Sequence, residues 1–523
     1  MARPPIRLFK RALAAGARAD ACMPAAAAAQ ASALALLARS VAMGHRRLAL
    51  LRLLAAVRVR ALVPAPDWAY CGKVASQAAD EALRGLFAEA EQTVVGGHGS
   101  ARGADAAPTR HACDRPRPLP SPHYRLENSM NKPEIFVVNA TRTAIGSFGG
   151  ALKDVPLSQL ASTAVREAIA RSGTDAASIG HVVLGNVIPT EPRDAYLARV
   201  AAIDAGIPNE TPAFNVNRLC GSGLQAIISA AQTLLLGDAE IAIGGGAESM
   251  SRGPYLLPAA RWGARMGDAP MTDYMLGVLH DPFHAIHMGI TAENVAASAG
   301  ITRDMQDALA VASQQRAARA IAEGRFKSQI VAVTMATRKG TVVFDTDEHV
   351  RGNVTLEQLA AMKPAFKKDG SVTAGNASGL NDAASAVVLA TGAAVQARGL
   401  KPLARLVAYA HAGVDPKLMG LGPVPASRLA LKRAGLGVND LDVVESNEAF
   451  AAQACAVTRA LELDPAKVNP NGSGISLGHP VGATGAIITT KALYELQRIQ
   501  GRYALVTMCI GGGQGIAAIF ERA

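Results

Sequence analysis

The sequence predicts an α/β protein with two similar halves, and three observations support this. Beyond residue 133, short apolar runs typical of strands alternate with amphipathic stretches typical of helices. This alternation occurs twice, over residues 130–250 and 401–523, with a less regular region between them. The 50 glycines and the apolar content of 50% suit such a fold, which combines many tight turns with a large core.

The individual elements follow from these local patterns. In the first half, we expect strands at Ile135–Val138, His181–Val187 and Ile241–Ile243, and helices at Ala161–Ala170 and Gln225–Leu236. In the second half, we expect strands at Leu441–Glu445 and Ala504–Met508, and helices at Phe450–Leu461 and Gly485–Ile499.

The two halves also share landmarks. Each contains an Asn-bearing strand that leads into Gly-Ser-Gly, at Gly221–Gly223 and Gly472–Gly474. Each also contains an apolar strand that runs into three glycines, at Gly244–Gly246 and Gly511–Gly513. This recurrence indicates an internal repeat.

Residues 251–380 form an insert between the halves. A helix is expected at Asp304–Gly324, but most of the insert consists of loops rich in Gly, Pro, His and Met. An insert of this kind is usually a lid or a binding region rather than core. Residues 381–400 are expected to return to the first half.

Residues 1–129 differ in kind from the rest of the chain. They hold 18 Lys or Arg against 9 Asp or Glu, whereas the remainder is nearly neutral. We expect this Ala/Arg-rich extension to be disordered, as at Arg110–Pro122, or not natively translated, with Met130 as the native start. A long transit peptide and a membrane anchor within residues 1–60 are the alternatives. The apolar run Ala21–Ala38 is mostly alanine, which makes a spanning helix a weak expectation.

Composition and cysteine spacing exclude several classes of protein. The near-neutral charge beyond residue 129 and the aromatic content of 4% argue against nucleic-acid binding. The six cysteines form no CxxC pair, which argues against a zinc site or a disulfide framework and favours a reducing compartment, the cytoplasm. These cysteines are Cys22, Cys71, Cys113, Cys220, Cys455 and Cys509.

Cys220 is the first candidate catalytic residue. It precedes the expected helix Gln225–Leu236, where the positive end of the helix dipole favours a thiolate. Gly221 and Gly223 beside it leave room for a bulky substrate. Taken alone, an inert buried cysteine is an equally good interpretation.

Three further motifs carry chemistry. His479 lies in Gly-His-Pro on a stiff loop, where it can act as a base toward a thiol. Cys509 ends an apolar strand before three glycines whose N–H groups can face an oxyanion. Asn447 follows another strand, where its amide can hold a water molecule or a carbonyl group. Each alone also fits a structural role: a loop histidine, a core cysteine and a helix cap.

Together the four motifs resemble the thiolase family. The matching stretches are NRLCGSG around Cys220, NEAF with Asn447, GHP with His479 and CxGGG with Cys509. The resemblance covers about residues 133–523, and it looks closest to bacterial acetyl-CoA acetyltransferases and short-chain β-ketothiolases. It extends through Thr141–Thr143, His287–Gly289 and Asn376–Gly379.

The resemblance implies a thiolase fold of two α/β halves, layered αβαβα, with an inserted loop domain. It also implies a reversible condensation of acetyl-CoA with an acyl-CoA through a ping-pong mechanism. Cys220 would carry the acyl group and His479 would take its proton. Cys509 would deprotonate the second acetyl-CoA. The N–H groups of Cys220 and Gly511 would form one oxyanion hole, and His479 with a water on Asn447 the other.

Coenzyme A contacts are implied by the same resemblance. His287 and Ser378 resemble the family's contacts to the thioester end and to pantetheine, and Arg351 a contact near the phosphates. Leu279, Met288, Phe366 and Phe450 look like apolar pocket walls, although core positions would look the same. No cofactor or metal is expected, because coenzyme A is substrate and product.

The resemblance further implies acyl-CoA molecules as partners, no membrane association, a homotetramer, and a role in fatty acid metabolism or in making polyhydroxyalkanoate precursors. Two alternatives stay open. A ketoacyl synthase shares the fold but uses histidines where this chain has Cys509 and Asn447. A non-catalytic lipid carrier would not need all four motifs.

Overall fold

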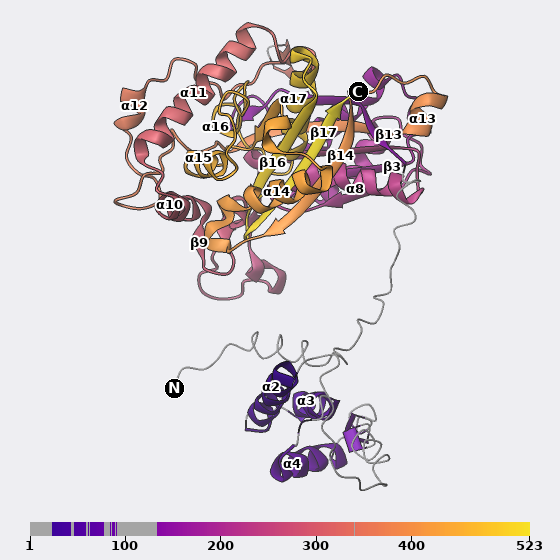
Figure 1. Cartoon of the computed structure of the whole chain (residues 1–523), viewed down its shortest axis with the longest axis vertical. Coiled ribbons are helices and arrows are strands. Elements are labelled where there is room, and N and C mark those ends of the chain that lie inside the picture. The colour runs from indigo at the N-terminus through magenta and orange to yellow at the C-terminus, as the bar shows by residue number, and fades with distance from the viewer. Residues whose placement is uncertain are drawn as a thin grey trace, which may run out of the picture. The chain divides into compact units, whose positions relative to one another are not determined.

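The computed structural model describes most of the chain (Figure 1). The described residues are 23–42, 46–58, 61, 63–77, 84, 86–88, 90–91, 133–338 and 340–523. The chain divides into two compact units, Met1–Ser121 and Pro122–Ala523.

The described part of the first unit is helical. It contains α2 (Met23–Ala42), α3 (Arg46–Arg58) and α4 (Ala65–Ser76), whose apolar side chains form a small buried cluster. Arg110–Pro122 and Met130 lie outside the described residues. Whether residues 1–129 belong to the native product stays a prediction.

The second unit is built on one sheet of eleven strands. Nine of them follow the order β15-β16-β17-β14-β1-β13-β5-β3-β4, and the short β2 and β10 join its middle. The bounds are β1 (Ile135–Thr143), β2 (Gly146–Ser147), β3 (His181–Gly185), β4 (Ala213–Val216), β5 (Ile241–Ser249), β10 (Ile330–Val331), β13 (Asn381–Thr391), β14 (Ala404–Gly413), β15 (Val443–Ser446), β16 (Tyr503–Ile510) and β17 (Gln514–Arg522).

The sheet consists of two half-sheets with the same plan. Between them, β1 and β14 pair only through Phe136 with Arg405 and Val137 with Ala404. In the series β1-β13-β5-β3, the successive pairs are antiparallel, antiparallel and parallel. The series β14-β17-β16-β15 repeats these directions. The predicted internal repeat is therefore confirmed, and residues 381–391 return to the first half.

Helices complete five layers, α-β-α-β-α. The central pair, α8 (Ser222–Leu236) and α17 (Thr484–Ile499), packs against both half-sheets in one buried apolar cluster. The outer faces are covered by α6 (Leu157–Ser172) and α7 (Leu197–Asp204) on the first half-sheet, and by α14 (Pro423–Ala434) and α15 (Ala451–Ala460) on the second. The expected α/β class and its layering are thus confirmed.

The central position of α8 explains its composition. Among the described residues, Leu219–Leu236 is the one stretch long and apolar enough to cross a membrane, and 61% of it is buried inside the fold. Its apolar character is that of a helix enclosed between two sheets.

The three glycines of the first half differ from the expectation, because they lie within β5 rather than after it. A Cβ at Gly246 would come within 2.2 Å of the carbonyl oxygen of Gly482, and one at Gly244 within 2.5 Å of the Cα of Ile227. The glycines let β5 touch the backbones of α8 and of the loop before α17.

The insert contributes short hairpins and four helical segments, of which α10, α11 and α12 lie near one another at one side of the unit (Figure 1). The predicted helix at Asp304–Gly324 is α11. The segments are α9 (Tyr274–Val278), α10 (Met288–Ala299), α11 (Arg303–Ala322) and α12 (Leu356–Ala360), and the hairpins are β6 (Tyr255–Leu256) with β7 (Thr272–Asp273), β8 (His280–Asp281) with β9 (Ile286–His287), and β11 (Val333–Thr337) with β12 (Gly340–Phe344).

Candidate active site

Cys220 lies in a sharp turn between β4 and α8. Leu219 before it has a φ of +48°, a left-handed conformation that is unusual for a residue with a Cβ. The hydroxyl of Ser222 closes the turn, since it accepts from the N–H of Arg218 at 2.8 Å and donates to the carbonyl of Leu219 at 2.7 Å. This turn presents Cys220 at the N-terminus of α8.

The Cys220 thiol is enclosed and faces two backbone donors. The N–H groups of Gly511 and of Cys220 itself point at its sulfur and favour the thiolate. Burial has the larger effect, and Glu248 acts in the same direction, so the pKa of the thiol lies above its ordinary value. The expectation that the helix dipole would leave a thiolate is therefore wrong, because burial outweighs the two N–H groups, and deprotonation of Cys220 needs a base.

His479 can be that base. Its Nδ1 lies 2.7 Å from Oγ1 of Thr484, and this hydroxyl lies 2.9 Å from the carbonyl oxygen of Pro480, to which it donates. Because the hydroxyl has one hydrogen, Nδ1 of His479 must donate to it and Nε2 keeps a free lone pair. Burial lowers the pKa of His479 to about 4, so the ring is neutral near pH 7 and ready to accept a proton.

Asn447 donates a long hydrogen bond to Nε2, the unprotonated nitrogen of His479. Its Nδ2 lies 3.4 Å from Nε2 of His479, and its own backbone N–H is anchored on the carbonyl of Thr507 at 3.0 Å. Within the described residues, Oδ1 of Asn447 is buried without a hydrogen-bond partner. An amide in this condition can hold a polar group of a substrate or a water molecule.

Cys509 is fully buried near the end of β16. Burial and the neighbouring Cys220 both raise the pKa of its thiol, which is therefore protonated near neutral pH. Gly511, which faces the Cys220 sulfur, follows two residues later. Gly512 and Gly513 have φ values of +79° and +82°, and they turn the chain into β17.

A cavity of about 380 Å³ contains both Cys220 and His479. Six of the seven residues expected to contact coenzyme A line it: Leu279, His287, Met288, Phe366, Ser378 and Phe450. His287 is fixed there, because its Nδ1 accepts from the N–H of Gly289 at 3.0 Å and its ring stacks on Phe366 with centroids 4.7 Å apart. Arg351, the seventh, is exposed and lies outside this lining.

A much smaller space of about 20 Å³ adjoins Cys220 on another side. This volume is close to that of one or two water molecules or a methyl group. Its walls are Val187, Leu219, Val278, Leu279, Met288, Val481 and Gly511.

Glu248 is a site residue that the sequence analysis did not identify. It is fully buried and accepts hydrogen bonds from the N–H groups of Val187, Ile188 and Gly482 at 2.8–3.1 Å. It therefore ties the loop after His479 to the first half. Burial raises its pKa to about 8 despite these donors. An acidic residue within the apolar strand β5 was the available signal.

Comparisons with known proteins give consistent results. Residues 135–393 match the family model "Thiolase, N-terminal domain" and residues 400–522 match "Thiolase, C-terminal domain". The chain is 68% identical to β-ketothiolase BktB of Cupriavidus necator over 74% of this chain and 99% of that protein. It is 50% identical to an acetyl-CoA acetyltransferase of Pseudomonas aeruginosa, again over 74% of this chain and 99% of the relative.

Solved structures resemble the second unit closely. The Bacillus anthracis acetyl-CoA acetyltransferase aligns with a TM-score of 0.74 and 46% identity, over 75% of this chain and 99% of that one. The human mitochondrial 3-ketoacyl-CoA thiolase aligns with a TM-score of 0.73 and 44% identity, over the same shares.

Proposed function

The chain belongs to the thiolase family, and from this premise we propose that it is a β-ketothiolase acting on short acyl-CoA thioesters. One observation carries the proposal: the Cys220 thiol and a neutral His479 line one cavity, and a second buried thiol, Cys509, lies beside Cys220. Two thiols with separate roles are what a condensation through an acyl-enzyme requires.

In the first step, His479 takes the proton of Cys220, whose sulfur attacks the thioester carbonyl. The N–H groups of Gly511 and Cys220, which already face this sulfur, stabilise the developing oxyanion. Coenzyme A leaves as a thiol with the proton from His479. Neutral thiol and neutral imidazole as the resting pair mean that charge appears only during the reaction.

In the second step, Cys509 first passes its thiol proton to Nε2 of His479, and the resulting thiolate removes a proton from the α-carbon of acetyl-CoA. The enolate oxygen accepts hydrogen bonds from the Nε2–H of His479, now protonated, and from a water molecule on Asn447, whose buried Oδ1 has no other partner among the described residues. The carbanion attacks the acyl group on Cys220, Cys220 leaves as a thiolate that takes the proton back from His479, and a 3-ketoacyl-CoA is released. The reverse reaction is thiolysis of that product.

Separate substitutions of the two cysteines test the proposal, because each thiol has a different role in it. We expect Cys220→Ala to abolish labelling by radioactive acetyl-CoA, and Cys509→Ala to form the acyl-enzyme but barely condense. Equal labelling of both variants would contradict these roles. A non-catalytic lipid carrier would show no thiolysis of acetoacetyl-CoA in the unmodified chain, and a ketoacyl synthase would not depend on Cys509.

The space of about 20 Å³ beside Cys220 favours short acyl groups. An acetyl methyl group fits it, whereas a longer chain must displace Leu279 or Met288. We therefore expect kcat/KM for thiolysis to fall with each carbon added beyond acetoacetyl-CoA. A flat profile across 3-ketoacyl-CoA lengths would show that the acyl chain lies elsewhere.

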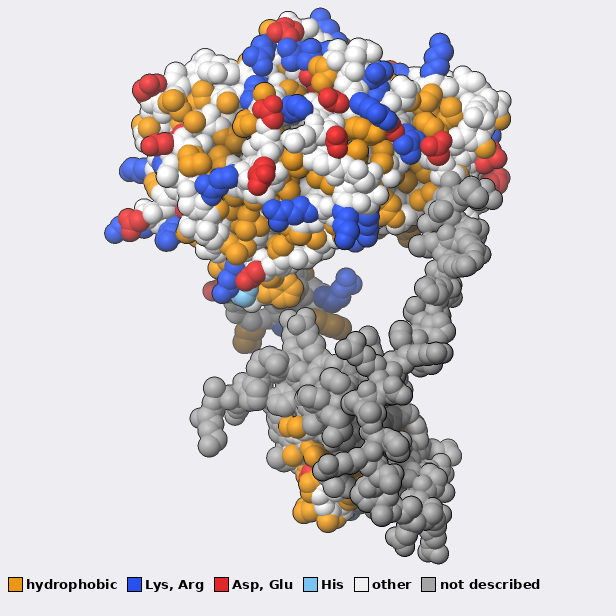
Figure 2. Space-filling view, viewed as in Figure 1, with side chains coloured by type: hydrophobic (Ala, Val, Ile, Leu, Met, Phe, Trp, Pro, Cys, Tyr) orange, Lys and Arg blue, Asp and Glu red, His pale blue; other side chains and the backbone are white. Residues whose placement is uncertain are grey.

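We further propose a homotetramer in the cytoplasm that binds neither nucleic acid nor membranes. Acidic and basic side chains are interspersed on the visible face of the second unit, which does not favour binding of a polyanion (Figure 2).

Exposed apolar side chains gather on the insert around β6 and β7 and suit contact with another copy of the chain. They are Tyr255, Leu256, Leu257, Trp262, Met266 and Met271. Sedimentation tests the assembly, and the Trp262→Glu variant should sediment as a smaller species than the unmodified chain.

Arg351 stays a proposed phosphate contact. Its exposed guanidinium suits an ion at the rim of a site, and Arg351→Ala should then raise KM for coenzyme A while leaving kcat unchanged. No cofactor other than coenzyme A as substrate and product is required, and a role in fatty acid metabolism or in supplying polyhydroxyalkanoate precursors fits this chemistry.

A further inference from the structure

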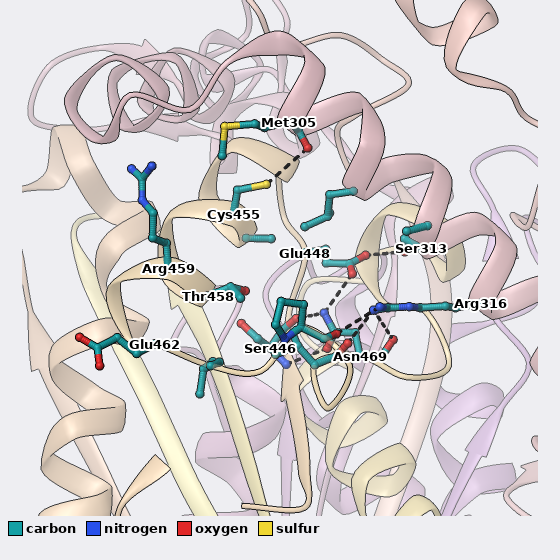
Figure 3. Close-up of a pocket in the computed structure, with 16 residues that line it drawn as sticks. Met305, Ser313, Arg316, Ser446, Glu448, Cys455, Thr458, Arg459, Glu462 and Asn469 are labelled. Atoms are coloured by element: carbon teal, nitrogen blue, oxygen red, sulfur yellow. Dashed lines mark hydrogen bonds between the residues drawn. The ribbon is translucent and has the colours of Figure 1, made fainter. Parts of the chain in front are cut away.

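A second cavity, of about 610 Å³, lies between α11 and α15 (Figure 3). It shares no lining residue with the cavity that contains Cys220. One face of α11 forms a wall, with Met305, Leu309 and Ala312 at intervals of three or four residues. Leu463 and Val468, in the chain after α15, add further apolar surface. The volume is within the range typical of small-molecule sites.

The inner end of this cavity is polar. Ser446, at the carboxyl end of β15, lines it and is 2% exposed, and among the described residues its hydroxyl has no hydrogen-bond partner. Its backbone N–H and carbonyl are both satisfied by the side chain of Asn469, at 2.9 and 2.8 Å. A buried hydroxyl without a partner is unfavourable, so a ligand that bonds to it gains free energy.

Charges of both signs line the same end. The guanidinium of Arg316 donates to the carbonyls of Val468 and Pro465 at 2.7 and 3.1 Å, and both acceptors are neutral. The carboxylate of Glu448 accepts from Ser313 at 2.6 Å and from Asn469 at 2.9 Å. A carboxylate entering here would meet Glu448, and an ammonium group would meet Arg316. A neutral hydroxyl or amide avoids both repulsions and can donate as well as accept.

The side chains at the outer end of the cavity do not favour a charged ligand either. Arg459 and Glu462 are both exposed there and extend in different directions (Figure 3). We propose that this cavity is a second ligand site, which takes a neutral amphipathic molecule with an unbranched hydrocarbon body and a terminal hydroxyl or primary amide. The body packs along Met305, Leu309 and Leu463, and the polar group bonds to Ser446.

The site lies directly behind the catalytic residues. Glu448 lines it and is the neighbour of Asn447, which contacts His479. Glu448 also accepts from the N–H of Ile475 at 3.4 Å, in the short helix α16 (Gly474–Leu477) that precedes His479. An occupant therefore touches the support of the catalytic loop without entering the coenzyme A cavity.

Four probes with the same body test the choice of head group: hexan-1-ol, hexanamide, hexanoate and hexylammonium. Binding to the full chain is measured by isothermal titration calorimetry, with and without saturating coenzyme A. We expect the alcohol and the amide to bind once per chain, at least about tenfold more tightly than the charged probes, and equally well with coenzyme A present. Absence of binding, equal affinity for all four, or displacement by coenzyme A would overturn the proposal.

Variants locate the binding. Ala312→Leu fills the cavity and should abolish binding of hexanamide, whereas Ala322→Leu, exposed in the last turn of α11 and outside the lining, should retain it. Ser446→Ala removes the hydroxyl and should weaken binding about fivefold. This second variant keeps the test decisive if Ala312→Leu does not fold. Unchanged affinity in Ser446→Ala would show that the polar group does not reach Ser446.

Discussion

Both halves of the second unit have a hydroxyl group at the start of the central helix, but the two hydroxyls have different roles. In each, the first residue of the central helix carries a hydroxyl that closes the loop holding a catalytic residue. Ser222 of α8 bonds the N–H of Arg218 and the carbonyl of Leu219, which directly precede Cys220. Thr484 of α17 bonds the carbonyl of Pro480 and also the imidazole of His479.

The difference between these hydroxyls follows from what each half supplies. The thiol of Cys220 has no tautomers, so its loop needs only to fix the position of the side chain. The hydrogen bonds between Ser222 and the backbone of that loop are sufficient for this. An imidazole has two tautomers, so its loop must also fix a proton, and the Thr484 hydroxyl holds that proton on Nδ1. A repeated fold can therefore build two unlike halves of one active site by changing a single contact.

The largest expected effect comes from removing the base itself. In His479→Gln, Cys220 keeps its two backbone donors but loses its proton acceptor, and we expect the rate of acylation to fall by about 10²–10⁴-fold. Single-turnover mixing with acetyl-CoA measures this step. A rate within tenfold of the unmodified enzyme would show that another group deprotonates Cys220.

Much of this comparison could be predicted from the sequence. Periodicity located both central helices within a few residues, and the motifs around Cys220 and His479 gave the positions of the two loops. The contact between Thr484 and His479 was missed, because a threonine at a helix start also fits an ordinary cap. The lowered pKa expected for Cys220 was wrong, because the helix dipole can be inferred locally whereas burial depends on the whole fold.

The halves should also respond to pH in opposite directions. Burial lowers the pKa of His479 to about 4, so between this value and its ordinary one of about 6.5 only the unfolded chain binds the proton. The free energy of unfolding therefore rises with pH across this window, by about 3 kcal/mol from His479. The raised pKa of Cys220 has the reverse effect, and its contribution is lost as pH rises above the ordinary value of a thiol.

Urea unfolding at pH 5 and pH 7 measures the contribution of His479. His479→Gln should be less sensitive to acid than the unmodified chain. His411, whose pKa burial also lowers to about 4, remains in both proteins and cancels in the comparison. Identical acid sensitivity in the two proteins would mean that His479 binds its proton equally well in the folded state.

Substitutions of Thr484 and Ser222 should have the smallest effects on catalysis, and they test the roles of the two hydroxyls most directly. Thr484→Val keeps the shape of the side chain but removes the acceptor for Nδ1 of His479, so part of the population takes the tautomer with a proton on Nε2. We expect kcat to fall about tenfold with little change in KM, and Thr484→Ser to restore it. Ser222→Ala should instead lower the free energy of unfolding by about 1–3 kcal/mol, because the N–H of Arg218 loses its partner. If both variants lower kcat equally and serine fails to rescue, Thr484 supports the loop only as Ser222 does, and the tautomer of His479 is set elsewhere.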